Sequence, residues 1–255
     1  MATYFWGPEK RLIVPTPDLA FLMHDDDSGR CQMHQVGVPE VSVINWAAQT
    51  FGDKEKIFID CGAHMGAYSV LLADYFKEVH AFEAQRRTFY QLCGNIFVNE
   101  KSNIFPYHLA VTDAAHANTA TTLYIVSEDG GGSSVKQPDK TQTVLAKELT
   151  KTQTIDHYHF HDVGLIKMDI EGNELSALKG ALYTLPRNYF PPIIFEANNS
   201  ESAKNEKQAL FKYLNSLDYE IAEIRPFDNL YLALNDQHPS TSIQRQFLQA
   251  SDTTS

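Results

Sequence analysis

The fold of this chain is decided by ten residues, which read Ile57-Phe58-Ile59-Asp60-Cys61-Gly62-Ala63-His64-Met65-Gly66. The apolar run at 57–59 is too short for a helix and rich in β-forming residues, so it predicts a buried parallel strand at 57–61. Two glycines follow, and a helical pattern begins directly after them at 67–76. A strand, a glycine turn and a helix N-terminus together predict a nucleotide-like ligand at the carboxyl edge of a sheet.

The acid at the end of this strand indicates which ligand to expect. A dinucleotide fingerprint reads Gly-x-Gly-x-x-Gly, whereas this chain has Asp60 in place of the first glycine and three residues between Gly62 and Gly66. A carboxylate that faces the turn repels a phosphate but suits an ammonium group or a hydroxyl. We therefore expect S-adenosylmethionine, which carries a sulfonium, an amine and a ribose diol, rather than NAD.

Strands and helices alternate along the rest of the chain. Helices are expected at 40–51, 86–98, 173–182 and 203–217, and strands at 79–82, 104–109, 121–126, 164–168, 193–195, 219–224 and 229–234. This rhythm predicts an α/β fold with a doubly wound, Rossmann-like sheet, mostly parallel with an antiparallel C-terminal strand. Residues 1–39 are rich in proline and are expected to be irregular or hairpin-like.

Length and composition are those of one large globular domain. The chain has 255 residues, of which 43% are hydrophobic and 21% charged, so it is long enough to bury a single core. We expect an N-terminal extension and lead-in helix at 1–55, a cofactor-binding domain at 56–236 and a polar C-terminal tail at 237–255. The oligomeric state is left open by these observations.

Charge and cysteine usage exclude several classes of protein. A net charge of −11 disfavours a nucleic-acid partner, because such binding needs lysine and arginine to neutralise phosphates. The three cysteines form no CxxC pair, so neither a zinc site nor a disulfide framework is expected. No apolar run reaches the length of a membrane span, and the N-terminus lacks a signal-peptide core. A cytoplasmic location is the resulting expectation.

Four predicted strands end in a carboxylate, namely Asp60, Glu83, Asp169 and Glu196. Ligands of open α/β sheets bind outside the carboxyl ends of the strands, so these acids are candidates for one site. The alternative is that each acid merely caps the following helix. Glu83 lies about twenty residues beyond the glycine turn, where an acid accepts hydrogen bonds from ribose hydroxyls.

Asp169 and Glu171 are the candidate reacting groups. At the period of a strand both side chains point one way, so one would face the methionine amine and the other an acceptor hydroxyl. A hydroxyl needs either a base or a metal ion to become a nucleophile. Asp169, Glu171 and Glu196 suit both routes, as a base with supporting acids or as ligands for Mg²⁺. Lys167 either orients and offsets these charges or is an outward, solvated lysine.

Several separated motifs resemble the FkbM-type methyltransferases. They are the glycine turn at 59–69, the strand end at 81–84, Asn95 to Asn99, the stretch 165–174, the stretch 178–181 and the strand at 193–196. The resemblance covers roughly residues 57–197 and implies a class I S-adenosylmethionine-dependent O-methyltransferase, of a family that often acts on sugar or polyketide hydroxyls. The chain departs from the usual pattern in two places, with His64 where Asn is common and Ala84-Gln85 where Pro-Asn is common.

The turn and the resemblance together give a predicted set of site residues. The cofactor contacts are expected to be Asp60, Gly62, Ala63, His64, Gly66, Ser69, Glu83, Ala84, Ala110 and Asp169. The catalytic residues are expected to be Asp169, Glu171, Lys167 and Glu196. Ser133 and Ser134 follow a glycine run at 130–132, which predicts either a lid over the acceptor or a flexible hairpin turn.

Three functions fit these observations. The first is O-methylation of a carbohydrate, a glycan or a similar small hydroxylated acceptor. The second is methylation of an RNA ribose hydroxyl, which the charge balance disfavours. The third is a non-catalytic module that binds an adenosyl group, which the combination of Asp169, Glu171 and Glu196 disfavours.

Overall fold

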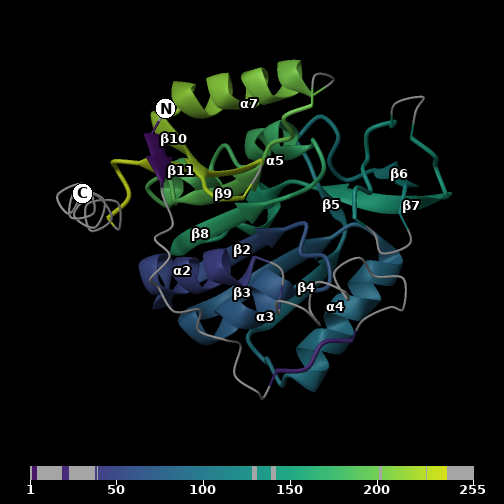
Figure 1. The fold of residues 1–255 in the computed structure, drawn as a ribbon, viewed down its shortest axis with the longest axis horizontal. Coiled ribbons are helices and arrows are strands. Elements are labelled where there is room, and N and C mark those ends of the chain that lie inside the picture. Colours follow the sequence, from purple (N-terminus) through teal and green to yellow (C-terminus); the bar gives the residue numbers. More distant parts are fainter. Residues whose placement is uncertain are drawn as a thin grey trace.

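The computed structural model places helices on both faces of a central sheet, giving three layers (Figure 1). It describes residues 2–4, 19–22, 38, 40–127, 131–138, 142–200, 203–227 and 229–239. Most of the segment 1–39, expected to be irregular or hairpin-like, and residues 240–255 of the expected polar tail lie outside the described residues. The sequence-based expectation of an α/β fold with a doubly wound, mostly parallel sheet is confirmed.

The central sheet has eight strands in the order β1-β10-β11-β9-β8-β2-β3-β4. β11 alone among these strands runs antiparallel to its neighbours, so the expected antiparallel C-terminal strand is also confirmed. The strands are β1 (Ala2–Tyr4), β2 (Asp53–Cys61), β3 (Phe76–Glu83), β4 (Ile104–His108), β8 (Val163–Met168), β9 (Ile193–Glu196), β10 (Tyr219–Ile224) and β11 (Leu230–Asn235).

The strand order reverses at β2. From β2 the chain first proceeds to β3 and β4 on one side, and later to β8 and β9 on the other. In open α/β sheets such a switch point opens a crevice at the carboxyl ends of the strands, which is where ligands bind. The turn after β2 and the turn after β8 therefore border the same crevice.

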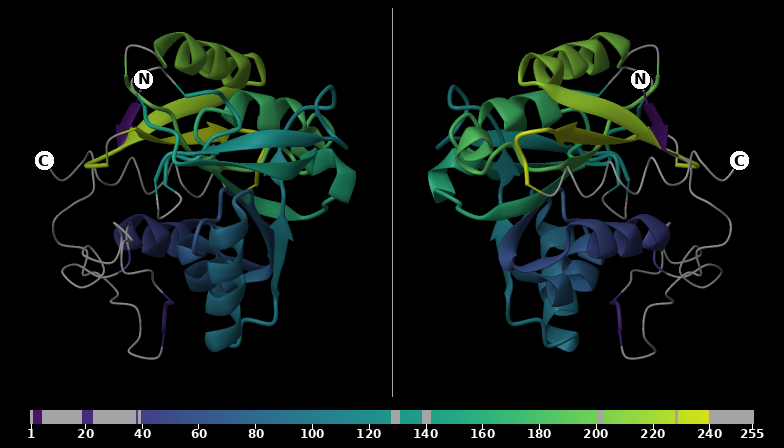
Figure 2. Two further views of the ribbon diagram at one scale, coloured as in Figure 1. Left: turned by 90° about the vertical axis from the view of Figure 1, so that its right-hand side faces the viewer. Right: turned by 90° about the vertical axis from the view of Figure 1, so that its left-hand side faces the viewer.

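Alternating side chains of the strands build one hydrophobic core on each face of the sheet. Phe58 of β2 faces the helices α2, α3 and α4, whereas its neighbour Ile59 faces α5, α6 and α7. Figure 2 shows these two groups of helices on opposite sides of the sheet. The helices are α2 (Val41–Phe51), α3 (Ala67–Leu72), α4 (Arg86–Val98), α5 (Glu174–Lys179), α6 (Thr184–Arg187) and α7 (Lys204–Ser216).

A second, three-stranded sheet with the order β5-β7-β6 stands beside the main one (Figure 1). It consists of β5 (Ala110–Val111), β6 (Ala120–Ile125) and β7 (Ala146–Gln153). The sequence analysis placed a strand at 121–126 but none at 146–153. β7 reads Ala-Lys-Glu-Leu-Thr-Lys-Thr-Gln, and its residues are largely exposed, so it lacks the apolar alternation on which strand prediction depends.

Two expected helices are shorter than predicted. The helical pattern at 67–76 gives α3 and then a 3₁₀ turn, η1 (Ala73–Tyr75), after which β3 begins at Phe76. The pattern at 173–182 gives α5, which ends before Gly180, and the separate short helix α6. A Cβ atom at Gly180 would lie 2.0 Å from the carbonyl oxygen of Thr112, so the chain there packs directly against a neighbouring backbone. A further 3₁₀ turn, η2 (Ile155–Tyr158), precedes β8.

Among the helices of the described residues, none is both long enough and apolar enough to cross a bilayer.

Candidate active site

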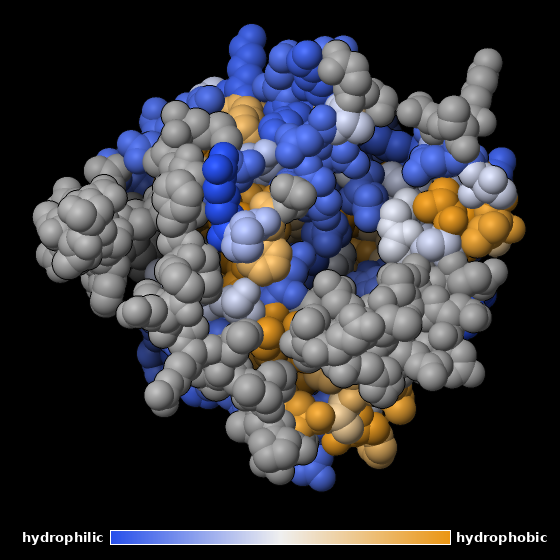
Figure 3. Space-filling view, in the orientation of Figure 1, coloured by the Kyte–Doolittle hydropathy of each residue, from blue (hydrophilic) through white to orange (hydrophobic). Residues whose placement is uncertain are grey.

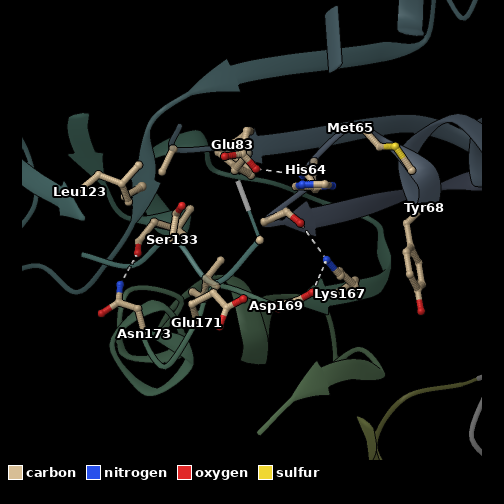
Figure 4. Close-up of a pocket in the computed structure, with 18 of the residues that line it drawn as sticks. His64, Met65, Tyr68, Glu83, Leu123, Ser133, Lys167, Asp169, Glu171 and Asn173 are labelled. Carbon is tan, nitrogen blue, oxygen red and sulfur yellow. Dashed lines mark hydrogen bonds and ion pairs between the residues drawn. The ribbon is translucent and has the colours of Figure 1, made fainter. Parts of the chain in front are cut away.

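A cavity of about 310 Å³ opens at the carboxyl ends of β2, β3 and β8, at the switch point of the sheet. Its volume lies within the range of small-molecule sites. Figure 4 shows the side chains of His64, Glu83, Lys167, Asp169 and Glu171 arranged around it. Of the predicted cofactor contacts, those that line it are Gly62, Ala63, His64, Glu83, Ala84, Ala110 and Asp169.

The glycine turn wraps tightly around the ends of two strands. Gly62 has φ +77°, and a Cβ atom there would lie 1.8 Å from the carbonyl oxygen of Asp169, so a side chain at this position has no room. His64 also lies in the left-handed region, with φ +51°, which histidine enters more readily than most residues. Gly66, at φ +93°, begins α3. At Gly62 the turn thus presents backbone rather than a side chain to the cavity.

Glu83, at the end of β3, is fixed by two backbone donors. The N–H of His64 donates to Glu83 Oε2 at 2.9 Å, and the N–H of Gln85 donates to Oε1 at 2.8 Å. Burial raises the pKa of this carboxyl, while the two N–H groups and the charge of Lys167 oppose the shift. Each oxygen has a remaining lone pair that a ligand hydroxyl can use.

Asp60 lies beneath the cavity rather than in its wall, which corrects the expectation that it faces the ligand. Its side chain is fully buried, and its Oδ2 accepts a hydrogen bond of 2.6 Å from Ser69 Oγ. Its Oδ1 lies 3.8 Å from Lys167 Nζ. Burial raises the pKa of Asp60, and Lys167 partly offsets the shift. Gly66, the N-cap of α3, and Ser69 within this helix are likewise absent from the cavity lining.

Lys167 on β8 points inward, so the alternative of a solvated strand lysine is wrong. Its Nζ donates to the carbonyl oxygen of Gly62 at 2.8 Å and lies 3.5 Å from Asp169 Oδ2. Burial alone would lower its pKa, but the carboxylates of Asp169 and Asp60 more than compensate and hold the pKa above its ordinary value. Lys167 therefore joins the glycine turn, the buried acid and the candidate reacting acid into one charged cluster.

Asp169 and Glu171 meet at the site, although not by the periodicity of a strand. β8 ends at Met168, and the chain then turns, with Glu171 in the left-handed region at φ +54°. The carboxyl of Glu174 holds this turn, because its Oε1 accepts hydrogen bonds from the N–H groups of Ile170 (3.0 Å) and Gly172 (3.2 Å). Burial raises the pKa of Glu171, and the charge of Asp169 adds to the shift.

A second cavity, of about 680 Å³, lies on the side of β9 and α7. Asp169 and Glu171 line both cavities, whereas Glu196 lines the second one. Burial raises the pKa of Glu196 to about 8, and the charge of Asp169 and a hydrogen bond with it contribute further. This environment favours the neutral form of Glu196. The three predicted catalytic acids and Lys167 form one cluster.

Residues 131–136 separate the two cavities. Gly131, Ser133 and Val135 line the first, and the alternate residues Gly132, Ser134 and Lys136 line the second. Ser133 and Ser134, both expected to contact the acceptor, thus face different cavities.

This strip also holds Glu171. The N–H of Gly132 donates to Glu171 Oε1 at 2.9 Å, and Ser134 Oγ donates to the carbonyl oxygen of Glu171 at 2.8 Å. Ser134 is in turn bridged to Tyr124 of β6. The strip is therefore an ordered wall in the described part of the glycine-rich stretch.

The strand-end acids are not helix caps. The residues at the N-cap positions of the four following helices are Gly66, Gln85, Asn173 and Ala203. The alternative reading of Asp60, Glu83, Asp169 and Glu196 as caps is therefore wrong. What these four acids share is their position at one edge of the sheet.

Several residues that line the first cavity were missed by the sequence analysis. Tyr68 of α3 donates to Glu40 Oε2 at 2.6 Å, and both residues belong to the lining. No spacing signal links two residues 28 positions apart. The same is true of the apolar wall, which combines residues of different elements, namely Leu109, Val111, Leu123 and Val135. Glu174, which lines the second cavity, could have been noticed in the sequence, because an acid in the first turn of a helix is favoured.

The arrangement of possible ligands does not support the metal route. Within the described ranges, no group of three or more His, Cys, Asp or Glu side chains is placed to hold a metal ion. Asp169, Glu171 and Glu196 are close enough to influence one another's charge, but they are not gathered around one point as metal ligands would be.

Comparison with known families identifies the chain. The family described as Methyltransferase FkbM domain matches residues 60–221, which is more than half of the sequence. The chain belongs to the FkbM methyltransferase family. The resemblance of the sequence motifs is thereby confirmed, and family membership supports S-adenosylmethionine as the methyl donor. Among curated proteins, none matches the chain.

The fold is similar to that of several solved structures. An FkbM methyltransferase from Methylobacillus flagellatus is 23% identical with a TM-score of 0.47; the match covers 71% of this chain and 43% of that protein, so this chain spans less than half its length. An rRNA methylase from Streptococcus thermophilus is 15% identical (TM-score 0.46, covering 78% and 96%). A precorrin-6y C5,15-methyltransferase from Geobacter metallireducens is 9% identical (TM-score 0.48, covering 79% and 92%).

Proposed function

We propose that this methyltransferase transfers a methyl group from S-adenosylmethionine to a hydroxyl of a carbohydrate, a glycan or a similar small hydroxylated acceptor. The observation that carries the proposal is the position of Asp169 and Glu171, which line both cavities at their boundary. A methyl donor in the first cavity and an acceptor in the second would meet at these two carboxylates.

The chemistry of the first cavity fits the methyl donor. Glu83 offers acceptors for a ribose diol, and the apolar side chains of Leu109, Val111 and Leu123 suit an adenine ring. Gly62 lines the cavity, and its lack of a side chain lets the turn pack directly against the backbone of Asp169. The negative charges of Asp169 and Glu171 suit the positive methionine end.

Proton removal is the task of the chain's own residues. When bound, S-adenosylmethionine supplies an electrophilic methyl group, and its transfer to the acceptor oxygen leaves the C–S bonding electrons on sulfur. Asp169 or Glu171 takes up the proton of the acceptor hydroxyl. Lys167 places a positive charge 3.5 Å from Asp169, and residues 131–136 keep Glu171 at the boundary. These contacts hold the two carboxylates in place between the two cavities.

The lining of the second cavity supports a small hydroxylated acceptor. Amide and hydroxyl side chains dominate part of it, and Lys136 is already paired with Glu206 at 2.8 Å. The five acids that line this cavity outnumber its two lysines. Figure 3 shows the α7 half of this face as mostly hydrophilic. A polyanion such as RNA needs the opposite balance of charge.

A methyl-transfer screen tests the proposal. Tritiated S-adenosylmethionine is incubated with panels of sugars, glycans and RNA, and transfer is counted for the wild type and for Asp169→Asn, which has nearly the same shape. We expect transfer to a sugar or glycan and at least a hundredfold loss in the variant. Transfer to RNA alone would overturn the acceptor class. Donor binding without transfer to any panel would favour a non-catalytic module.

The choice between a base and Mg²⁺ needs its own measurement. The base route predicts that EDTA leaves the rate unchanged and that added Mg²⁺ has no effect. Loss of activity in EDTA and its recovery with Mg²⁺ would replace the base by a metal at Asp169, Glu171 and Glu196.

A further inference from the structure

Residues 19–22 lie against α4 and are held there by side-chain amides. Asn99 accepts from the N–H of Ala20 at 2.9 Å and donates to its carbonyl oxygen at 2.7 Å. Gln91 donates to the carbonyl oxygen of Leu22 at 2.7 Å. Figure 1 shows this segment, in purple, beside α4. These residues precede the part of the chain that matches the family, so family membership gives them no role.

Asn95 occupies the centre of this contact and faces two ways. Its Oδ1 accepts from the N–H of Leu22 at 2.6 Å, and its Nδ2 donates to the carbonyl oxygen of Met65 at 2.7 Å. The side chain is completely buried, so each of these bonds is costly to lose. Gln91, Asn95 and Asn99 are spaced by four residues and therefore form one stripe along the helix.

The Met65 bond connects this stripe to the methyl-donor cavity. Met65 lines that cavity and lies within the glycine turn, between His64 and Gly66. The N–H of His64 is in turn the donor to Glu83. A continuous path of hydrogen bonds thus runs from Leu22 through Asn95 to the turn, and a satisfied buried network of this kind is rigid.

We propose that Asn95 is a positioning residue that couples residues 19–22 to the glycine turn, so that this N-terminal segment strengthens binding of the methyl donor. The inference rests on the proposed use of the first cavity for S-adenosylmethionine. Coupling between two sites is reciprocal, so donor binding must also hold residues 19–22 more firmly against α4.

A double variant that weakens the attachment of residues 19–22 to α4 tests whether this segment strengthens donor binding. We call it the strap-release variant. Gln91→Ala with Asn99→Ala removes three of the four hydrogen bonds described above for residues 19–22 while leaving Asn95 and its bond to Met65 in place. By calorimetry we expect affinity for S-adenosylhomocysteine to fall about tenfold, within the range of known couplings. The matched control is Asn103→Ala, which removes an amide that bonds the carbonyl oxygens of Ala73 and Phe76 instead. Its affinity should equal that of the wild type.

Hydrogen exchange of the wild type tests whether ligand binding holds residues 19–22 more firmly. This measurement needs no variant, so it does not depend on whether a variant folds. Saturating S-adenosylhomocysteine should slow exchange at the amides of Ala20 and Leu22 by about tenfold. If the ligand binds but exchange there is unchanged, and the strap-release variant keeps its affinity, the coupling is disproved. If the wild type does not bind the ligand at all, it is the proposed function that fails.

Discussion

Lys167 is the buried cation on which the charged cluster depends. It is 6% exposed and lies within 4 Å of both Asp60 and Asp169. Lys167→Met leaves two carboxylates without this partner, so we expect the free energy of unfolding to fall by about 3 kcal/mol. Urea unfolding measures the change, and methyl transfer should be lost in parallel.

Two further variants separate the effect of charge from that of lost packing. Adding Asp60→Asn to Lys167→Met removes one uncompensated charge and should restore part of the stability. Lys101→Met removes a lysine whose partner, Asp74, is exposed, and should cost less than about 1 kcal/mol. Equal losses in the Lys101 and Lys167 variants would contradict the role assigned to Lys167.

Glu196 should make stability depend on pH near neutrality. Its pKa is about 8 in the folded chain, against an ordinary value of 4.5. Between these values the folded chain holds a proton that the unfolded chain releases, so stability falls as pH rises through this window. Glu174, whose pKa burial raises to about 7, acts in the same direction.

Glu196→Gln should therefore flatten the decline of stability between pH 5 and pH 8, leaving the part that Glu174 contributes. Urea unfolding at pH 5, 6.5 and 8 measures the slope for both proteins. Glu55→Gln, at an exposed position on β2, is the control and should keep the wild-type slope. An unchanged slope in Glu196→Gln would mean that this carboxyl is ionised in the folded chain.

At the scale of elements, the turn after β2 and the end of β8 are in direct contact. Gly62→Ala would drive a Cβ atom into the carbonyl oxygen of Asp169 and would also strain a residue at φ +77°. We expect a loss of roughly 3 kcal/mol in the free energy of unfolding and weaker donor binding. Calorimetric unfolding and a binding titration measure both quantities.

Gly94→Ala gives the comparison for Gly62. Gly94 lies within α4, where alanine is the better helix former, and its Cβ would meet only the mobile end of Leu22. Its stability should change by less than about 1 kcal/mol. If Gly62→Ala changed the free energy of unfolding as little, the turn after β2 and the turn after β8 would be able to move apart without loss of stability.

The elements that the sequence predicts well are those with a strong apolar period. The helix at 86–98 was predicted with the bounds that α4 has, and the strand at 219–224 with those of β10. β7 was missed because its buried side chains, Thr150 and Thr152, are polar and its partners β5 and β6 are distant in sequence. The turn at 169–172 was misjudged because the bonds from Glu174, not the strand, set its course.

At the scale of the molecule, the sequence predicts which residues belong to the site more reliably than it predicts where each of them lies. Acids at strand ends must gather at one edge of a parallel sheet, so Glu83, Asp169 and Glu196 were predictable. That Asp60 lies beneath the cavity follows from its pairing with Lys167, which is 107 residues away. The division into two cavities depends on residues 131–136, whose course no local pattern encodes.

The charge of the whole molecule separates a small hydroxylated acceptor from a polyanion. With a net charge of −11 and an acidic second cavity, methylation of a neutral sugar or glycan should change less than about twofold between 50 and 200 mM NaCl. An RNA acceptor held by six or more phosphate contacts would lose roughly a thousandfold in affinity over the same range. Initial rates of methyl transfer from tritiated donor to the best acceptor of the screen, measured at several NaCl concentrations, give the dependence of the rate on salt. A steep fall with salt would place a cationic surface near the site and reverse the choice of acceptor.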